Sequence, residues 1–255
     1  MPVPHFEGKH RHEALYQPAD VLARWALTEP LPPTPAGVIF CWDKRLLAWL
    51  DSSASVTPVL WDRMLQARLY QLPDGLAAAY LIGWGAPSAA YVFELLIALG
   101  TRRFVIAGTA GGLGPTLRMG DVVVCDRAIR DEGVSHHYLE PGKYSFPSPA
   151  LTSAVGRALS DAGVPFRTGT TWTVDAVFRE TAAEARYHAE DGALAVEMEA
   201  AALFAIAHVR QVDIAAAVVL SDLLLEDRHV PPDPEVYASH LLAVFQAAKA
   251  ALTAA

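Results

Sequence analysis

Short apolar runs alternate with longer segments of helical character along most of this chain, and this alternation limits the possible folds more than any single motif does. The apolar runs predict strands at 37–41, 76–84, 103–107, 122–125, 166–173 and 214–220. Helices are predicted between and after them, at 43–50, 88–99, 149–162, 197–208 and 234–253. Strands that alternate with helices in this way are typical of an α/β fold.

The chain is predicted to form one domain preceded by an arm. Its 255 residues suit a single large α/β unit. No internal repeat and no shift in composition divides the sequence into halves. The proline-rich stretch 30–35 is too short for an interdomain linker and is interpreted as a connector. We therefore expect an N-terminal arm and connector over residues 1–36 and one α/β domain over residues 37–255.

The charge balance argues against two classes of partner. Lys and Arg number 20 against 28 Asp and Glu, which gives a formal net charge of −8, and the chain has no basic run. An acidic chain of this kind is a poor binder of nucleic acids or of membrane surfaces. The first residues contain no apolar run, and the most apolar windows are shorter than the roughly 20 residues of a spanning helix. We expect no signal peptide, no membrane span and a cytoplasmic location.

Cysteine and histidine usage favours neither disulfides nor a metal. Cys41 and Cys125 are the only cysteines, which is too few for a disulfide framework, and they lack zinc-ligand spacing. Buried free thiols are the expected state. None of the nine histidines forms a pair with metal-ligand spacing in a structured context, and we predict no metal site.

Two glycine-rich segments follow predicted strands. Gly108-Thr109-Ala110-Gly111-Gly112-Leu113-Gly114 is predicted to be a turn, either an anion-binding nest of backbone N–H groups or simply a tight connection between strands. Its spacing matches neither a dinucleotide fingerprint nor a Walker loop. The second segment, 83–88, leads from a strand into a helix. Both lie at carboxyl ends of strands, where ligands bind in parallel α/β sheets.

Three acidic residues lie in apolar surroundings. Glu197 and Glu199 fall at the start of a predicted helix. Each residue of a helix is rotated by ~100° from the one before, so these two side chains point about 200° apart and cannot form an acid–base pair. Either one faces a site while the other caps, or both complement the helix dipole. Asp222 follows the apolar strand 214–220, so partial desolvation would raise its pKa toward that of a general acid. The alternative is an Asp that caps the next turn.

Taken together, these motifs resemble the nucleoside phosphorylase-I family. The resemblance rests on five segments in order, namely Gly83-Trp84-Gly85-Ala86-Pro87-Ser88, Gly108-Thr109-Ala110-Gly111-Gly112-Leu113, Gly120-Asp121-Val122-Val123-Val124, Val196-Glu197-Met198-Glu199-Ala200 and Ser221-Asp222. The family includes purine nucleoside and uridine phosphorylases and methylthioadenosine/adenosylhomocysteine nucleosidases. The resemblance implies a single α/β domain with a central mixed, barrel-like sheet flanked by helices. It also implies assembly as dimers or trimers of dimers, and cleavage of a ribonucleoside with inorganic phosphate as co-substrate and no cofactor.

The resemblance also implies roles for individual residues. Asp222 matches the acid that protonates or hydrogen-bonds N7 of a purine. The expected substrate-binding residues are Glu199 at the ribose hydroxyls, Met198 beneath the sugar, the adjacent Glu197, and the segment Thr109, Ala110 and Gly111. Phe178 is a candidate for stacking on the base, with Arg179 as a possible contact to it. His12 is the best candidate for a contact to the ribose pocket of a neighbouring subunit.

Two positions of the family's phosphate site differ in this sequence. The family's phosphate-binding arginine two residues before the glycine segment corresponds to Ile106, and its early phosphate loop is present only as Cys41-Trp42-Asp43-Lys44-Arg45. Arg45 and Thr109 are the remaining phosphate-binding candidates. The Gln and Arg that uridine phosphorylases use correspond to Thr181 and Ala183. We therefore expect a nucleoside phosphorylase acting on purine nucleosides. The alternatives are a uridine phosphorylase, a nucleosidase that uses water, and a nucleoside-binding module without activity.

Overall fold

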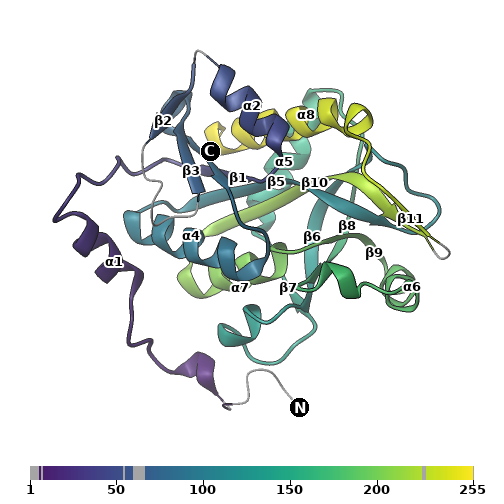
Figure 1. The fold of residues 1–255 in the computed structure, drawn as a ribbon, viewed down its shortest axis with the longest axis horizontal. Helices are drawn as coiled ribbons and strands as arrows, with labels where there is room; N and C mark the ends of the chain where they lie inside the picture. The colour runs from purple at the N-terminus through teal and green to yellow at the C-terminus, as the bar shows by residue number, and fades with distance from the viewer. Residues whose placement is uncertain (1–5, 7, 54, 60–66, 226–227, 255) are drawn as a thin grey trace.

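The structure is a computed structural model that describes residues 6, 8–53, 55–59, 67–225 and 228–254 (Figure 1). One sheet contains all of its strands, in the order β11-β10-β6-β8-β9-β5-β1-β4-β3-β2, with β7 paired to β6. The strands are β1 (Val38–Cys41), β2 (Thr57–Val59), β3 (Ala67–Gln71), β4 (Ala77–Leu81), β5 (Arg103–Leu113), β6 (Val122–Asp131), β7 (Tyr144–Ser145), β8 (Phe166–Val174), β9 (Ala193–Glu197), β10 (Asp213–Leu224) and β11 (His229–Val230).

Five of these strands close into a barrel. β5 pairs with both β9 and β10, and β10 continues through β6 and β8 back to β9. The β5–β10, β6–β8 and β8–β9 pairs are parallel, whereas β6–β10 and β5–β9 are antiparallel. This mixed barrel within a single α/β domain confirms the predicted fold class.

Helices cover the sheet on two sides. The helices are α1 (Pro18–Trp25), α2 (Lys44–Ser52), α4 (Ala86–Leu99), α5 (Pro149–Asp161), α6 (Ala182–Glu190), α7 (Ala200–Arg210) and α8 (Pro234–Thr253). α4 and α7 lie together on one side of the central strands, and α2, α5 and α8 lie on the other (Figure 1). Two buried apolar clusters correspond to these two sides.

Small side chains let strands and helices approach closely in the middle of the molecule. The alanines of 77–79, 200–202 and 215–217 are all buried. Val38–Phe40 of β1 lie between β4 and β5, opposite Ala77–Ala79 on one side. Cys41 and Cys125 are both buried free thiols, as predicted.

The segment predicted as a glycine-rich turn is part of a strand. β5 runs without interruption to Leu113, and the backbone first adopts a positive φ at Gly114. The glycines serve close packing instead: a Cβ at Gly111 would lie 2.7 Å from Leu224 Cδ1 and 3.0 Å from Val196 Cγ1. Because Gly111 pairs with neighbouring strands on both sides, its backbone forms sheet and not an anion-binding nest.

Two further boundaries differ from the prediction. Glu197 is the last residue of β9 and Glu199 is the N-cap of α7, so the two glutamates do not share the first turn of a helix. β10 extends past Leu220 to Leu224, so Asp222 lies within the strand and caps no turn. The helix predicted over 197–208 begins at Ala200 instead, because pairing with β8 holds Glu197 in the sheet.

The N-terminal segment runs along the outside of the domain (Figure 1). It contains the short 3-10 turn η1 (Lys9–Arg11), helix α1 and the proline-rich stretch, which leads to β1. Residues 1–5 and 7 of the expected arm, and Ala255 of the expected domain, lie outside the described residues. Among the helices of the described parts of the chain, none is long and apolar enough to span a membrane.

Candidate active site

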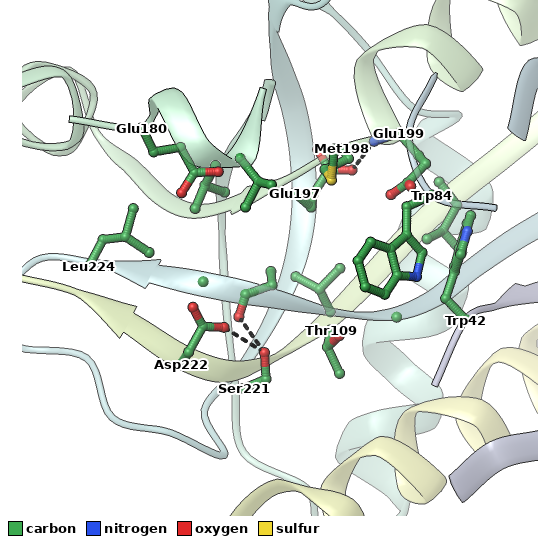
Figure 2. Close-up of a pocket in the computed structure, with 17 residues that line it drawn as sticks. Trp42, Trp84, Thr109, Glu180, Glu197, Met198, Glu199, Ser221, Asp222 and Leu224 are labelled. Atoms are coloured by element: carbon green, nitrogen blue, oxygen red, sulfur yellow. Dashed lines mark hydrogen bonds between the residues drawn. The ribbon is translucent and has the colours of Figure 1, made fainter. Parts of the chain in front are cut away.

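A cavity of about 290 Å³ lies beside the barrel strands β5, β9 and β10 (Figure 2). It is lined by Trp42, Trp84, Ile106, Gly108, Thr109, Ala110, Gly111, Val177, Glu180, Val196, Glu197, Met198, Glu199, Val218, Ser221, Asp222 and Leu224. Glu199, Trp42 and Trp84 lie toward one end in Figure 2, and Glu180, Asp222 and Leu224 lie toward the other. The structure thus brings together most of the residues that the motifs singled out.

Glu197 anchors the loop between β9 and α7. One carboxylate oxygen accepts hydrogen bonds from the backbone nitrogens of Glu199 and Ala200 at 2.7 and 2.6 Å. The other accepts from the hydroxyls of Thr173 and Thr171 at 2.5 and 3.4 Å. A carboxylate at a helix N-terminus satisfies N–H groups that lack a partner within the helix. Glu197 therefore fixes the position of Glu199, which matches the alternative in which one glutamate caps and the other faces a site.

Glu199, the residue expected at the ribose hydroxyls, is a buried carboxyl group. Its Oε1 accepts a 2.6 Å hydrogen bond from the backbone nitrogen of Gly85, the N-cap of α4. Burial, followed by the charge of Glu197, raises the pKa of Glu199 to about 8. Burial likewise raises the pKa of Glu197. Gly85, in the predicted strand-to-helix connection, therefore contacts the candidate site directly through its hydrogen bond to Glu199.

Asp222 reaches the cavity because β10 is irregular beside it. The register of β10 against β5 shifts between Leu220 and Asp222, and such a bulge re-aims the side chains around it. Asp222 Oδ1 accepts a 2.7 Å hydrogen bond from Ser221 Oγ, and Oδ2 lies 2.9 Å from Nε2 of His229 on β11. The Asp222 carboxylate is thus held between a hydroxyl and an imidazole.

Glu180 is a site residue that the sequence argument missed. It follows the 3-10 turn η4 (Val177–Arg179) and lines the same cavity as Asp222. Burial raises the pKa of Glu180 to about 7, and the charge of Asp222 adds to the shift. A glutamate among loop residues carries no motif, so only the folded arrangement identifies it.

The lining of the cavity is acidic and otherwise largely apolar. It contains Glu180, Glu197, Glu199 and Asp222, and none of its lining residues in the described part of the chain is Lys, Arg or His. Ile106 contributes to the wall. Arg45 lies outside this lining, where its guanidinium donates to the hydroxyl of Tyr237 at 3.2 Å and pairs with Asp43 at 3.5 Å.

Three further candidates lie outside the cavity within this chain. Phe178 is 97% exposed and lines a neighbouring groove, while the adjacent Val177 faces the cavity. Arg179 is exposed beside it. His12 is exposed in the N-terminal segment, where its ring lies 5.6 Å from that of Phe6.

Two tryptophans contribute aromatic surface to the end of the cavity where Glu199 lies. Trp42 follows β1 and donates its indole N–H to the carbonyl of Gly83 at 3.2 Å. Trp84 lies in the adjoining loop and is 73% exposed. Trp84 stands in the glycine motif 83–88, but a lone aromatic residue there gave no indication that it faces a ligand.

A family model confirms what these motifs suggest. The model described as the phosphorylase superfamily matches residues 69–255, nearly three quarters of the chain. The chain belongs to the phosphorylase superfamily. The match covers five of the cavity's wall-forming segments, from the Trp84 loop to β10, and leaves out β1 and Trp42.

Individual members of the phosphorylase superfamily are similar to this chain. It is 34% identical over 149 residues to a uridine phosphorylase of Treponema pallidum, covering 54% of this chain and 58% of that protein. It is 31% identical over 147 residues to a DeoD-type purine nucleoside phosphorylase of an Exiguobacterium species, covering 56% and 61%. The alignments thus span about three fifths of these relatives' own length.

The fold agrees with that of solved members. A purine nucleoside phosphorylase from Toxoplasma gondii superposes with a TM-score of 0.75, at 19% identity, over 87% of this chain and 93% of that one. At this identity the likeness describes the fold. The comparisons therefore support both the family and the barrel architecture.

Proposed function

We propose that this chain is a nucleoside phosphorylase, which cleaves the N-glycosidic bond of a ribonucleoside with phosphate to give the free base and ribose 1-phosphate. The observation that carries the proposal is that one cavity joins Glu199 at one end to Asp222 at the other. The names of its relatives, uridine and purine nucleoside phosphorylases, support the same reaction class.

Glu199 would bind the ribose. Its ionised carboxylate can accept hydrogen bonds from sugar hydroxyls, while Gly85 holds Oε1 in place. Met198 would pack against the sugar from the same loop, and Thr109 and Ala110 would line the junction of sugar and phosphate. A negative charge close to the ring also stabilises the positive charge that develops there in an oxocarbenium-like transition state.

Asp222 would act at the leaving base. As the C1′–N9 bond of a purine nucleoside breaks, its electron pair moves into the base, and a proton delivered to N7 neutralises the charge. Asp222 lies at this end of the cavity, with its Oδ2 2.9 Å from Nε2 of His229. A positioned general acid typically contributes ~10²–10⁴-fold to the rate.

A purine is the base we favour. Asp222 offers N7 an acid, and Thr181 and Ala183 stand where the uridine-specific pair would be expected. Glu180, with a pKa of about 7, adds a second carboxyl that can exchange hydrogen bonds with polar edges of a base. Phe178 and Arg179 would take part only if a substrate extends from the cavity into the neighbouring groove, which shares Val177, Glu180 and Leu224 with it.

Phosphate would bind beside Thr109 in the cavity. The oxygen that attacks C1′ belongs to phosphate, and its charge needs a cationic partner. Arg45, three residues after Trp42, is the candidate within this chain, because its side chain is partly exposed and its contacts are a 3.5 Å ion pair with Asp43 and a 3.2 Å hydrogen bond to Tyr237. A basic side chain from another subunit of a homo-oligomer would serve the same purpose, and His12 is the candidate for a ribose contact made in that way.

Hydrolysis is the second candidate reaction. The specific observation in its favour is the apolar wall formed by Ile106, Trp42 and Trp84, with no basic side chain among the described lining residues. Water carries no charge and needs no cation, so it would enter such a cavity more easily than phosphate.

Base release from a panel of nucleosides tests the proposal. Purified protein would be incubated with guanosine, inosine, adenosine and uridine at saturating phosphate, and the free base quantified by chromatography. Release from at least one purine nucleoside, at a rate at least 100-fold above that of the E199Q variant, supports it. Release from none of the four nucleosides would favour the nucleoside-binding alternative.

A further inference from the structure

A cluster of three potential metal ligands lies outside the active-site cavity. It consists of Asp131, Glu184 and His188, each of which brings one ligand atom to within 4.8 Å of the other two. Asp131 is the last residue of β6, and Glu184 and His188 lie on α6. Because residues four apart share one face of a helix, α6 presents the carboxylate and the imidazole side by side.

The burial of His188 distinguishes this cluster from an ordinary group of surface acids. This histidine is only 7% exposed, and its Nδ1 is buried without a hydrogen-bond partner among the described residues. A buried polar atom without a partner costs free energy, commonly ~1–3 kcal/mol, and native proteins rarely leave such an atom unsatisfied. An imidazole that lies beside two carboxylates and still needs a partner is well suited to a cation.

The surroundings already hold two of the ligands in place. The indole ring of Trp172 packs against the His188 ring, with centroids 4.4 Å apart and the planes tilted by 31°, and its Nε1 donates a 2.9 Å hydrogen bond to Asp131 Oδ2. One side chain thus orients both the histidine and the aspartate. Partners of this kind behind the ligands fix their orientation and commonly determine metal affinity.

We propose that Asp131, Glu184 and His188 form a binding site for a divalent first-row transition metal ion such as Zn²⁺, which ties α6 to the end of β6. One imidazole and two carboxylates form a mixed nitrogen and oxygen donor set, which suits Zn²⁺ or Co²⁺ better than the oxygen-preferring Mg²⁺ and Ca²⁺. A tetrahedral zinc ion holds its ligand atoms about 3.3–3.6 Å apart, so small side-chain rotations would close the site. Three protein ligands leave a fourth position for water.

The site would act on structure and not on the reaction. None of its three residues lines the active-site cavity. However, α6 begins two residues after Glu180, so an ion bound here would steady the helix that follows this wall of the cavity. The proposal is independent of the proposed enzymatic activity, and its test needs no substrate.

Calorimetric titration of metal-free protein with Zn²⁺ and visible spectra with Co²⁺ test the proposal. The variants are E184Q and H188Q, and E190Q, which changes an exposed glutamate on the same helix, is the matched control. We expect saturable binding of Zn²⁺ that E184Q and H188Q each weaken at least about tenfold, while E190Q leaves it within twofold. The Co²⁺ spectrum of the wild-type protein should show a visible band that E184Q removes.

Two outcomes would overturn the proposal. One is the absence of saturable Zn²⁺ binding to the wild-type protein. The other is binding that survives E184Q unchanged, as binding of zinc by histidines elsewhere in the chain would. If H188Q does not fold, E184Q decides the question alone, because Glu184 is only half-buried.

Discussion

The backbone nitrogen of Gly85 donates a 2.6 Å hydrogen bond to Oε1 of Glu199, across 114 residues of sequence. This contact links the turn that starts α4 to the N-cap of α7. The positive φ of 90° at Gly85 lets the backbone approach where most side chains would be strained. A buried carboxylate held in this way has its Oε1 fixed in position.

Glu199→Gln is expected to abolish activity while stabilising the fold. The amide oxygen can still accept from Gly85, but it cannot provide a negative charge at the sugar, so kcat/KM should fall at least about 100-fold. Because burial raises the pKa of Glu199 to about 8, the ionised form costs stability at higher pH. At pH 8 the free energy of unfolding of the variant should therefore exceed that of the wild-type protein by about 0.5–2 kcal/mol, and the variant should unfold at a higher temperature. Calorimetry showing a less stable variant would contradict this account.

The pH dependence of kcat/KM should reflect the same carboxyl. If ionised Glu199 binds the ribose, kcat/KM for a neutral nucleoside rises with pH and levels off above about 8. Stability follows the opposite sign: the unfolded glutamate ionises near its ordinary value and the folded one near 8, so the free energy of unfolding contributed by this group falls between these pH values. A kcat/KM that falls as the pH rises from 6 to 8 would remove Glu199 from this role. Glu180 titrates near 7, so the same profile in E180Q separates the two groups.

Asp222→Asn should impair purine cleavage more than uridine cleavage. The amide cannot donate an acidic proton to N7, whereas uridine has no N7 to protonate, so we expect a loss of ~10²-fold or more on the purine alone. Rates on inosine and uridine measure the difference, with exposed Asp161→Asn as the control. Equal losses on both substrates would remove Asp222 from the N7 role.

Arg210→Met should destabilise the protein without affecting the site. Arg210 makes hydrogen bonds of 2.8–3.1 Å to buried Glu94, which also accepts from Tyr138, and this joins α7 to α4. Removing the guanidinium leaves a buried carboxylate with one partner, at a cost of about 2 kcal/mol, moderated because Arg210 is partly exposed. Denaturant unfolding checks the value against exposed Arg157→Met. A change below about 0.5 kcal/mol would show that the ion pair does not hold the two helices together.

His12→Ala tests the expected contact from a neighbouring subunit. His12 is exposed and lies outside the cavity of its own chain, so only a partner subunit can bring it to a ribose pocket. If it does, KM for the nucleoside should rise about tenfold in the variant while its oligomeric state is unchanged. An unchanged KM would assign His12 to the solvent-exposed arm.

Sequence patterns predicted the framework better than the details of the site. Helix 234–253 and the α/β class follow from periodicity alone, and the structure places Glu197 and Glu199, which the motif singled out, in the wall of one cavity. The turn predicted at 108–114 was wrong because glycine has two uses: it permits positive φ, and it also leaves room for neighbours. Here Gly111 and Gly112 leave room for Leu223 and Leu224.

Other features depend on contacts that no local pattern records. The bulge that turns Asp222 toward the cavity arises from pairing with β5, more than a hundred residues away. Glu180 and Trp42 reach the site from loops, where hydrophobic periodicity gives no information. Phe178 was preferred for stacking because it is aromatic, but the turn at Val177–Arg179 exposes its side chain and directs that of Val177 to the cavity.

Arg45→Met tests where phosphate binds. If Arg45 supplies the cation, the variant should raise KM for phosphate at least about tenfold and leave KM for the nucleoside nearly unchanged. The exposed Lys44→Met variant is the matched control on the same helix. Equal KM values for phosphate in the wild-type protein and R45M would assign the cation to another residue or subunit.

The dependence of base release on phosphate tests the central claim most directly. Initial rates of base release from a purine nucleoside would be measured in phosphate-free buffer and across a phosphate titration, with ribose 1-phosphate and ribose quantified as products. The account predicts saturable activation by phosphate, with one ribose 1-phosphate formed for each base released. Base release at full rate without phosphate, with free ribose as the product, would contradict it and establish hydrolysis.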